Sequence, residues 1–159
     1  WSNDVNCLVE ATVRVVDPIP GVEDALRFAQ NHADQIVVSQ ASQETLGREW
    51  GNSGLTKLVR FLAGQELGSK TEHIRSATAG KGYLPDRILM VGDAPGDQRA
   101  AEANQALFFP IIPGKEASSW QRFTDEGLAR FLDGRFAGDF QRELLAEFEA
   151  ALPANRTWN

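Results

Sequence analysis

Residues 87–97 read RILMVGDAPGD, and this stretch decides the fold class. Its apolar run ILMV, bounded by turn formers, predicts a fully buried strand. Pro95 is suited to the first turn of a following helix, because a residue there needs no backbone N–H. Asp93 therefore ends the predicted strand, and Asp97 lies one turn into the helix, at the sheet edge where open α/β sheets bind their ligands.

Two carboxylates beside a helix N-terminus suit Mg²⁺ together with a phosphate group. A structural interpretation is equally open at this point. In that interpretation Asp93 caps the helix, and Asp97 interacts favourably with the helix dipole.

Composition narrows the function classes. The 159 residues fit one domain, and the net charge of −6 argues against a nucleic-acid partner. Cys7, the single cysteine of the sequence, excludes an internal disulfide and is compatible with a reducing cytoplasm, where we expect the protein to act. No apolar run is long enough for a membrane helix, so no membrane partner is expected. The chain begins with Trp1 rather than methionine, which predicts that it is a piece of a longer polypeptide.

Short apolar segments alternate with amphipathic ones, a pattern typical of a parallel sheet covered by helices on both faces. The predicted strands cover residues 35–39, 58–63, 87–92 and 106–112. The predicted helices cover residues 22–29, 42–54, 71–79, 95–103, 116–132 and 139–151. Pro110 marks the last strand as an edge, or as a place where its N–H is not needed. An apolar stripe in the last helix is expected to pack on the core: Leu144, Leu145, Phe148 and Leu152.

Polar groups follow three of these segments. Ser39 follows the strand IVV, Lys70 opens a helix after a glycine, and Asp93 with Asp97 follows ILMVG. Taken singly, Ser39 is typical of a turn hydroxyl and Lys70 of a solvated surface lysine. Together, a hydroxyl, a cation and a carboxylate pair at one sheet edge form a phosphoryl site without its nucleophile. His73 lies near this site, and we interpret it as a surface or packing residue.

These motifs, in this order, make the sequence resemble the haloacid dehalogenase (HAD) superfamily of phosphatases and related hydrolases. About half of the chain carries the resemblance. The matching segments are PIPGVEDAL (18–26), VVSQAS (37–42), GSKTEHI (68–74) and ILMVGDAPGDQRAA (88–101).

The resemblance implies a three-layer Rossmann-like parallel sheet with helices on both faces, followed here by a C-terminal helical extension. It implies that Ser39 hydrogen-bonds the phosphoryl group and that Lys70 offsets its charge. Asp93 would bind Mg²⁺, and Asp97 would support the metal site. The implied activity is Mg²⁺-dependent hydrolysis of a small phosphorylated metabolite through an aspartyl-phosphate intermediate.

The sequence departs from the family at one point. Family members open with a strand that ends in DxD and carries the nucleophile, whereas this chain offers only Asp4-Val5-Asn6 and Asp17-Pro18-Ile19. In the family's sheet that strand is central, between the strands that here end in Ser39 and Asp93. Without that strand, two rows of buried backbone N–H and C=O groups would have no hydrogen-bond partners. Each such group lowers the stability of the fold by about 1–3 kcal/mol.

We therefore predict that a missing N-terminal segment of the same polypeptide supplies the first strand and the nucleophile. Residues 1–16 are then the remnant of a helical cap or linker, and residues 17–135 the HAD-like core without that strand. Residues 136–159 form the C-terminal helical extension, and this chain alone is expected to be inactive.

Two other functions are compatible with the pattern. A non-catalytic relative would have kept the sheet as a binding or regulatory module and lost the nucleophile. A phosphoacceptor receiver domain shares the sheet type, but it places its acid pair first and its lysine last, the reverse of the order here.

Overall fold

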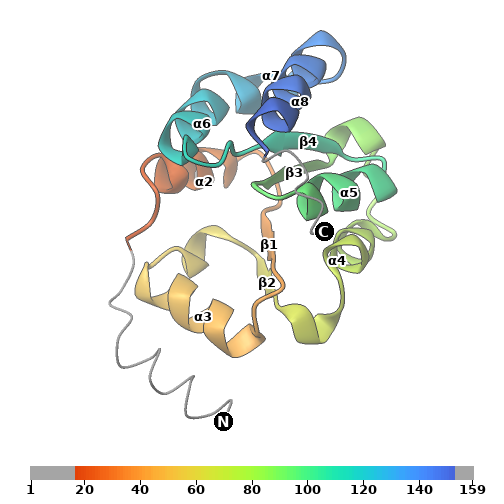
Figure 1. Cartoon of the computed structure of the whole chain (residues 1–159). Coiled ribbons are helices and arrows are strands. Elements are labelled where there is room, and N and C mark those ends of the chain that lie inside the picture. The colour runs from red at the N-terminus through yellow and green to blue at the C-terminus, as the bar shows by residue number, and fades with distance from the viewer. Residues whose placement is uncertain (1–16, 153–159) are drawn as a thin grey trace, which may run out of the picture.

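The structure is a computed structural model that describes residues 17–152, and within them helices alternate with short parallel strands (Figure 1). The predicted cap remnant, residues 1–16, lies outside the described part. In chain order the elements are α2 (Val22–Ala29), β1 (Ile36–Val38), α3 (Gln43–Asn52), β2 (Phe61–Ala63), α4 (Lys70–Thr78), β3 (Leu89–Gly92), α5 (Pro95–Ala103), β4 (Leu107–Pro110), α6 (Glu116–Arg122), α7 (Leu128–Leu132) and α8 (Asp139–Ala151). Short 3-10 helices cover Thr56–Leu58, Gln65–Leu67 and Pro85–Arg87, and a π-helical turn covers Phe123–Gly127. No helix among the described residues has the length and apolar content needed to cross a membrane.

Local signals account for where the helices begin. The Ser42 hydroxyl accepts a hydrogen bond from the Thr45 N–H at the start of α3. Ser69 and Glu72 form a reciprocal capping box at the start of α4, and Pro95 is the first residue of α5. The helices predicted at these places are therefore confirmed, with α5 ending at the predicted residue.

The strands form two separate parallel pairs, β1 with β2 and β3 with β4. The α/β class and the parallel pairing are as predicted, whereas a single continuous sheet is not present in residues 17–152. The segment predicted as a strand over 58–63 is a strand only at Phe61–Ala63, because only these residues lie opposite Ile36–Val38. A strand of a sheet covered on both faces is expected to be buried, whereas β1 is half-buried.

The edge of β1 that faces away from β2 has no strand beside it among the described residues. Ser39 donates its N–H to the Ala63 carbonyl, 2.9 Å away, so the odd-numbered residues of this segment face β2. By the alternation of a parallel ladder, Ile36 and Val38 turn their N–H and C=O groups away from β2.

The edge of β3 that faces away from β4 likewise has no strand beside it among the described residues. The Gly92 carbonyl accepts from the Ile111 N–H at 2.8 Å, so Leu89 and Val91 turn their backbone groups away from β4. Pro110 stands at a position of β4 that faces away from β3, where a missing N–H loses no ladder hydrogen bond. The prediction that Pro110 marks an edge is confirmed within the described pairing.

The β3–β4 pair carries a hydrophobic cluster on each of its faces. One cluster joins Leu107 and Phe109 to residues of α2, the α6–α7 segment and α8. The other joins Met90 and Phe108 to residues of α4, α5 and α8. Helix α8 packs against β4 and contributes Leu144 to the first cluster and Phe148 to the second, so the predicted apolar stripe does pack on the core. Where the domain boundaries fall stays a prediction.

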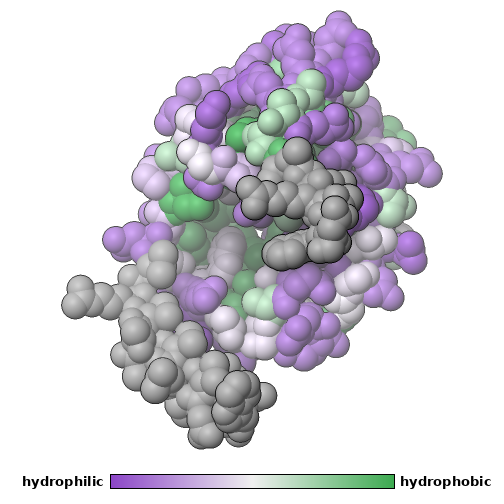
Figure 2. All heavy atoms as spheres, in the orientation of Figure 1, coloured by the Kyte–Doolittle hydropathy of each residue, from purple (hydrophilic) through white to green (hydrophobic). Residues whose placement is uncertain are grey.

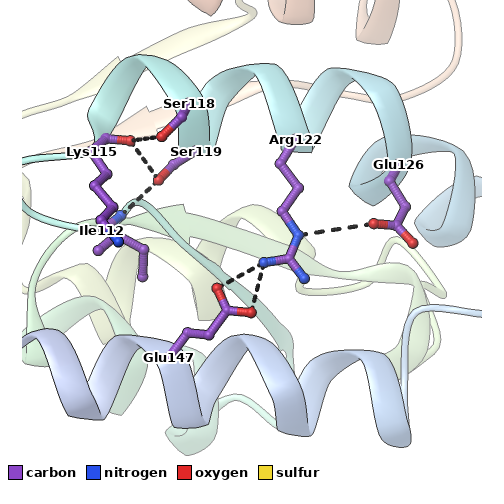
Figure 3. Close-up of polar contacts among 7 residues, drawn as sticks. All are labelled: Ile112, Lys115, Ser118, Ser119, Arg122, Glu126 and Glu147. Atoms are coloured by element: carbon purple, nitrogen blue, oxygen red, sulfur yellow. Dashed lines mark hydrogen bonds and ion pairs between the residues drawn. The ribbon is translucent and has the colours of Figure 1, made fainter.

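Polar contacts hold the C-terminal helices onto this core (Figure 3). The Arg122 guanidinium of α6 donates to both carboxylate oxygens of Glu147 in α8, at 2.8 and 2.9 Å. The buried Ser119 hydroxyl accepts from the Ile112 N–H at 3.0 Å and donates to the Lys115 carbonyl at 2.9 Å. The Arg122 contacts thus join α6 to α8, and the Ser119 contacts join the chain that leaves β4 to α6.

A π-helical turn interrupts the helix predicted over 116–132. A Cβ at Gly127 would lie 2.7 Å from the Phe109 ring, which also packs edge-on against Phe123 at a centroid distance of 5.0 Å. The backbone therefore widens at Phe123–Gly127 where this strand residue packs against it.

Candidate functional site

The turn from β3 into α5 places the two predicted carboxylates in different environments. Asp93, the first residue after β3, is exposed. Asp97 is 2 % exposed, and its Oδ2 accepts a hydrogen bond from the Ala94 N–H at 3.1 Å. The N-cap residue is Ala94, so the cap interaction comes from Asp97 in the first turn and not from Asp93.

Lys70 and Asp97 form an ion pair between the first turns of α4 and α5. The Lys70 Nζ donates to Asp97 Oδ1, and the lysine side chain is 24 % exposed. The capping box at Ser69 fixes the backbone from which Lys70 extends. The sequence placed Lys70 and Asp97 at one sheet edge, and the structure brings these two side chains into contact.

Gly92 makes the tight approach of Asp97 possible. A Cβ at this position would lie 2.5 Å from Asp97 Cγ, a distance that real side chains essentially never show. The carboxylate can therefore turn back over the end of β3 only because residue 92 is glycine. The sequence analysis did not assign this role, although a glycine between a buried strand and an acid could have signalled it.

Ser39 lies directly after β1, as predicted, and its hydroxyl oxygen accepts from the Ala41 N–H at 3.1 Å. This is the turn interaction that the residue type favours. The hydroxyl hydrogen remains able to donate to a further group. Within residues 17–152, no hydrogen bond joins Ser39 to Lys70 or to Asp93.

The donor set fits a divalent cation in part. Asp93 offers an exposed carboxylate, whereas both oxygens of Asp97 already have hydrogen-bond donors. Mg²⁺ binds through one or two carboxylates and keeps several waters. Residues 17–152 contain no group of three or more His, Cys, Asp or Glu side chains that could hold a metal ion.

The sequence analysis did not include Asn104 in the site, and it interpreted the nearby His73 as a surface or packing residue. The Asn104 amide donates to the Thr71 carbonyl at 3.1 Å and to the Ala100 carbonyl at 2.8 Å, which joins the first turn of α4 to α5. His73 is 6 % exposed, and neither ring nitrogen has a hydrogen-bond partner in the described structure.

A second polar group lies at the opposite, amino ends of the strands. The Asp34 carboxylate accepts from the Tyr83 hydroxyl and pairs with the Arg60 guanidinium. The Tyr83 hydrogen bond, and then Arg60, lower the pKa of Asp34, and the same hydrogen bond raises the pKa of Tyr83. This group is exposed and far along the strands from Asp93, so it does not belong to the candidate site.

Two depressions in the surface of the described residues contain none of the predicted site residues. One of about 300 Å³ lies before β1 and β2 and is lined by Gln30, Ala33, Gln35, Lys57, Leu58, Val59 and Arg60. The space-filling view shows the molecule hollowed between its upper and lower parts, with apolar residues on the floor (Figure 2).

Comparison with models of protein families, with curated proteins and with solved structures found no match to this chain.

Proposed function

We propose that this chain is the core, without its first strand, of a Mg²⁺-dependent phosphatase of the HAD type, acting on a small phosphorylated metabolite in the cytoplasm. The observation that carries the proposal is the Lys70–Asp97 ion pair beside the carboxyl end of β3. It puts a cation, a buried carboxylate and two helix N-termini at one edge of a parallel pair of strands. Such an edge suits a phosphoryl group, whose charge needs fixed donors and cations.

The two free strand edges support the part of the proposal that concerns the sheet. Ile36 and Val38 of β1, and Leu89 and Val91 of β3, turn backbone groups away from their partners. One further parallel strand between β1 and β3 would pair with both rows. The order would then be β2, β1, the added strand, β3, β4: a three-layer Rossmann-like sheet with its central strand in place.

The nucleophilic carboxylate would stand at the carboxyl end of that added strand, outside this chain. Its oxygen would attack phosphorus as the P–O bond to the substrate breaks, and the leaving oxygen would take a proton from the second carboxyl group of the DxD motif, which regains one from the attacking water in the next step. Water then attacks the aspartyl-phosphate, releasing phosphate and restoring the carboxylate. Mg²⁺, when bound, offsets the charge on the phosphoryl oxygens.

The side chains of this chain would divide the remaining work. Asp93 would hold the metal ion, and the Ser39 hydroxyl would donate to a phosphoryl oxygen. Lys70 has two further N–H donors besides the one directed to Asp97, and these would contact the phosphoryl group. Asp97 would act through Lys70 and the Ala94 N–H, as a positioning residue.

The test is phosphate release from small phosphate monoesters by the polypeptide that contains this chain together with the added strand. Asp93→Asn should abolish the Mg²⁺-dependent rate, because the amide oxygen is a much poorer ligand than the carboxylate. Asp86→Asn, which changes another exposed carboxylate just before β3, is the matched control and should leave the rate unchanged. Full activity in Asp93→Asn would refute the proposal.

A binding or regulatory module is the second candidate, and one observation favours it. Asp97, the carboxylate expected to support the metal site, already accepts from Lys70 and from the Ala94 N–H, while Lys70 and Ser39 keep donors for a phosphate group. Such a module would bind inorganic phosphate or vanadate without releasing phosphate from any monoester. Titration with vanadate, followed by the monoester assay on the same sample, separates the two functions.

A further inference from the structure

Asn104 joins the two helices that carry the Lys70–Asp97 ion pair. It is the C-cap residue of α5, and its side-chain amide donates to the Ala100 carbonyl of the same helix at 2.8 Å. The amide nitrogen has a second N–H, and it also donates to the Thr71 carbonyl of α4 at 3.1 Å. Thr71 directly follows Lys70, so this hydrogen bond holds the turn of α4 from which the lysine side chain extends.

The end of α5 keeps the Asn104 amide in place. The backbone N–H of Asn104 is directed to the Ala101 carbonyl at 3.0 Å, and the side-chain amide takes the Ala100 carbonyl instead. Gln105, with a φ of 55°, and the Ala106 N–H, which donates to the Ala101 carbonyl at 2.9 Å, complete the helix end. The amide is therefore fixed on α5, and its bond to α4 links the two helices.

Apart from the ion pair, the other contacts between α4 and α5 leave their relative position less defined. The apolar cluster that the two helices share includes Ile74 of α4 and the small residues Ala100 and Ala101 of α5. Apolar contact is non-directional, so packed helices of this kind can slide by small amounts. The capping box of Ser69 and Glu72 lies within α4 and sets only its local shape. The hydrogen bond from α5 to α4 is directional, and it defines where the helices lie along each other.

We propose that Asn104 is a positioning residue that holds the first turn of α4 against α5 and thereby keeps the Lys70 ammonium group on Asp97. This inference rests on the proposed function and deepens it. Lysine has a long and flexible stem, so an ion pair alone does not fix where its backbone lies. With α4 held, the ammonium group keeps one place, and its two further N–H donors stay available to a phosphoryl group. A displacement of about 1 Å can slow catalysis about a hundredfold.

Asn104→Ser separates this role from the capping of α5. A serine hydroxyl can donate to the carbonyl four residues back, here that of Ala100, but it is too short to reach α4. The variant therefore keeps the hydrogen bond within α5 and loses the one to Thr71, whereas Asn104→Ala loses both. Asn52→Ser is the matched control, because Asn52 is an exposed asparagine at the end of another helix, α3.

The test is a double-mutant cycle on urea unfolding of the 159-residue chain, with Asn104→Ser made in the wild-type chain and in Lys70→Met. Within residues 17–152 no hydrogen bond joins the Lys70 and Asn104 side chains, and changes at such separate sites normally combine to within about twofold in the unfolding constant. We expect Asn104→Ser to raise the unfolding constant at least about threefold more in the wild-type chain than in Lys70→Met. Asn52→Ser should have the same effect in both backgrounds.

Phosphate release by the polypeptide that contains this chain together with the added strand gives the second measurement. Asn104→Ser should lower kcat about tenfold or more, because the ammonium group of Lys70 no longer keeps its place. Asn52→Ser should leave kcat unchanged.

Equal effects of Asn104→Ser in the two backgrounds of the unfolding cycle would overturn the positioning role, and so would a wild-type kcat in this variant. Wild-type stability in Asn104→Ser, with a loss only in Asn104→Ala, would also overturn it, since capping of α5 would then be the whole role. Coupling in the unfolding cycle without any phosphate release would support the hold of Asn104 on Lys70 and overturn only the proposed function.

Discussion

Replacing Lys70 with methionine tests the ion pair at the centre of the site. The substitution keeps most of the side-chain stem and removes the charge, which leaves Asp97 Oδ1 without its donor. Asp97 is 2 % exposed and keeps only the hydrogen bond from the Ala94 N–H. The variant thus buries a carboxylate whose charge is no longer balanced.

The expected cost follows from burial. Removing one partner of a fully buried pair costs about 3–5 kcal/mol. The Lys70 side chain is 24 % exposed, so water can reach the site in its absence, and we expect the lower end, about 3 kcal/mol. That loss is a large fraction of the ~5–15 kcal/mol that stabilises a typical domain.

Urea unfolding of the 159-residue chain at neutral pH measures the effect. Lys57→Met is the matched control, because Lys57 is exposed in a short 3-10 helix and its replacement should change stability by less than about 0.5 kcal/mol. The double variant Lys70→Met/Asp97→Asn should cost less than the sum of the two single changes. A Lys70→Met midpoint equal to that of Lys57→Met would refute the reasoning.

Three further changes test other features. Gly92→Ala should destabilise the chain by about 2 kcal/mol or more in urea unfolding, because the added methyl group meets the Asp97 carboxylate; an unchanged midpoint would contradict the close approach. Gln105→Gly should stabilise it by about 1 kcal/mol in the same assay, since Gln105 has a φ of 55°, and a loss of stability would show that its side chain contributes. Tyr83→Phe should raise the pKa of Asp34 toward its ordinary value in an NMR titration of the carboxyl carbon, because the Tyr83 hydrogen bond is the largest cause lowering it. Because the pKa of Asp34 is lowered in the folded state, ionised Asp34 stabilises the fold at any pH above its unfolded-state pKa. This stabilisation is lost as the pH falls through the folded-state pKa. Since Tyr83→Phe raises the folded-state pKa, acid unfolding of the variant should begin at a higher pH.

Features that depend on neighbours in sequence could be predicted. The α5 helix runs from Pro95 to Ala103 as expected, because the proline, the first-turn acid and the small residues all act within the helix. Ser42 caps α3 for the same reason. The apolar stripe of α8 follows from the spacing of its apolar residues along a helix, and Leu144 and Phe148 are buried as this spacing predicts.

Features that depend on contacts between residues far apart in the sequence could not be predicted. The apolar residues Ile36–Val38 predicted a buried strand, but the exposure of β1 depends on which strands lie beside it. The presence of Lys70 and Asp97 at one edge followed from the order of motifs, whereas their direct contact joins residues 27 positions apart. Nothing in the residues around His73 indicates that its ring is buried without partners, since that depends on everything packed against α4.

The π-helical turn at Phe123–Gly127 has a consequence for how chain length can vary in natural variants. Deleting one residue there would restore regular α-helix and leave the rotation of everything after it nearly unchanged, because the π-helical turn holds one residue more than an α-helical turn. Leu128 and Phe131 would then stay in the cluster around Phe109. Deletion of one residue should therefore be tolerated between residues 123 and 127, as in the exposed loop at residues 80–84, and be selected against in the regular helix of residues 128–132.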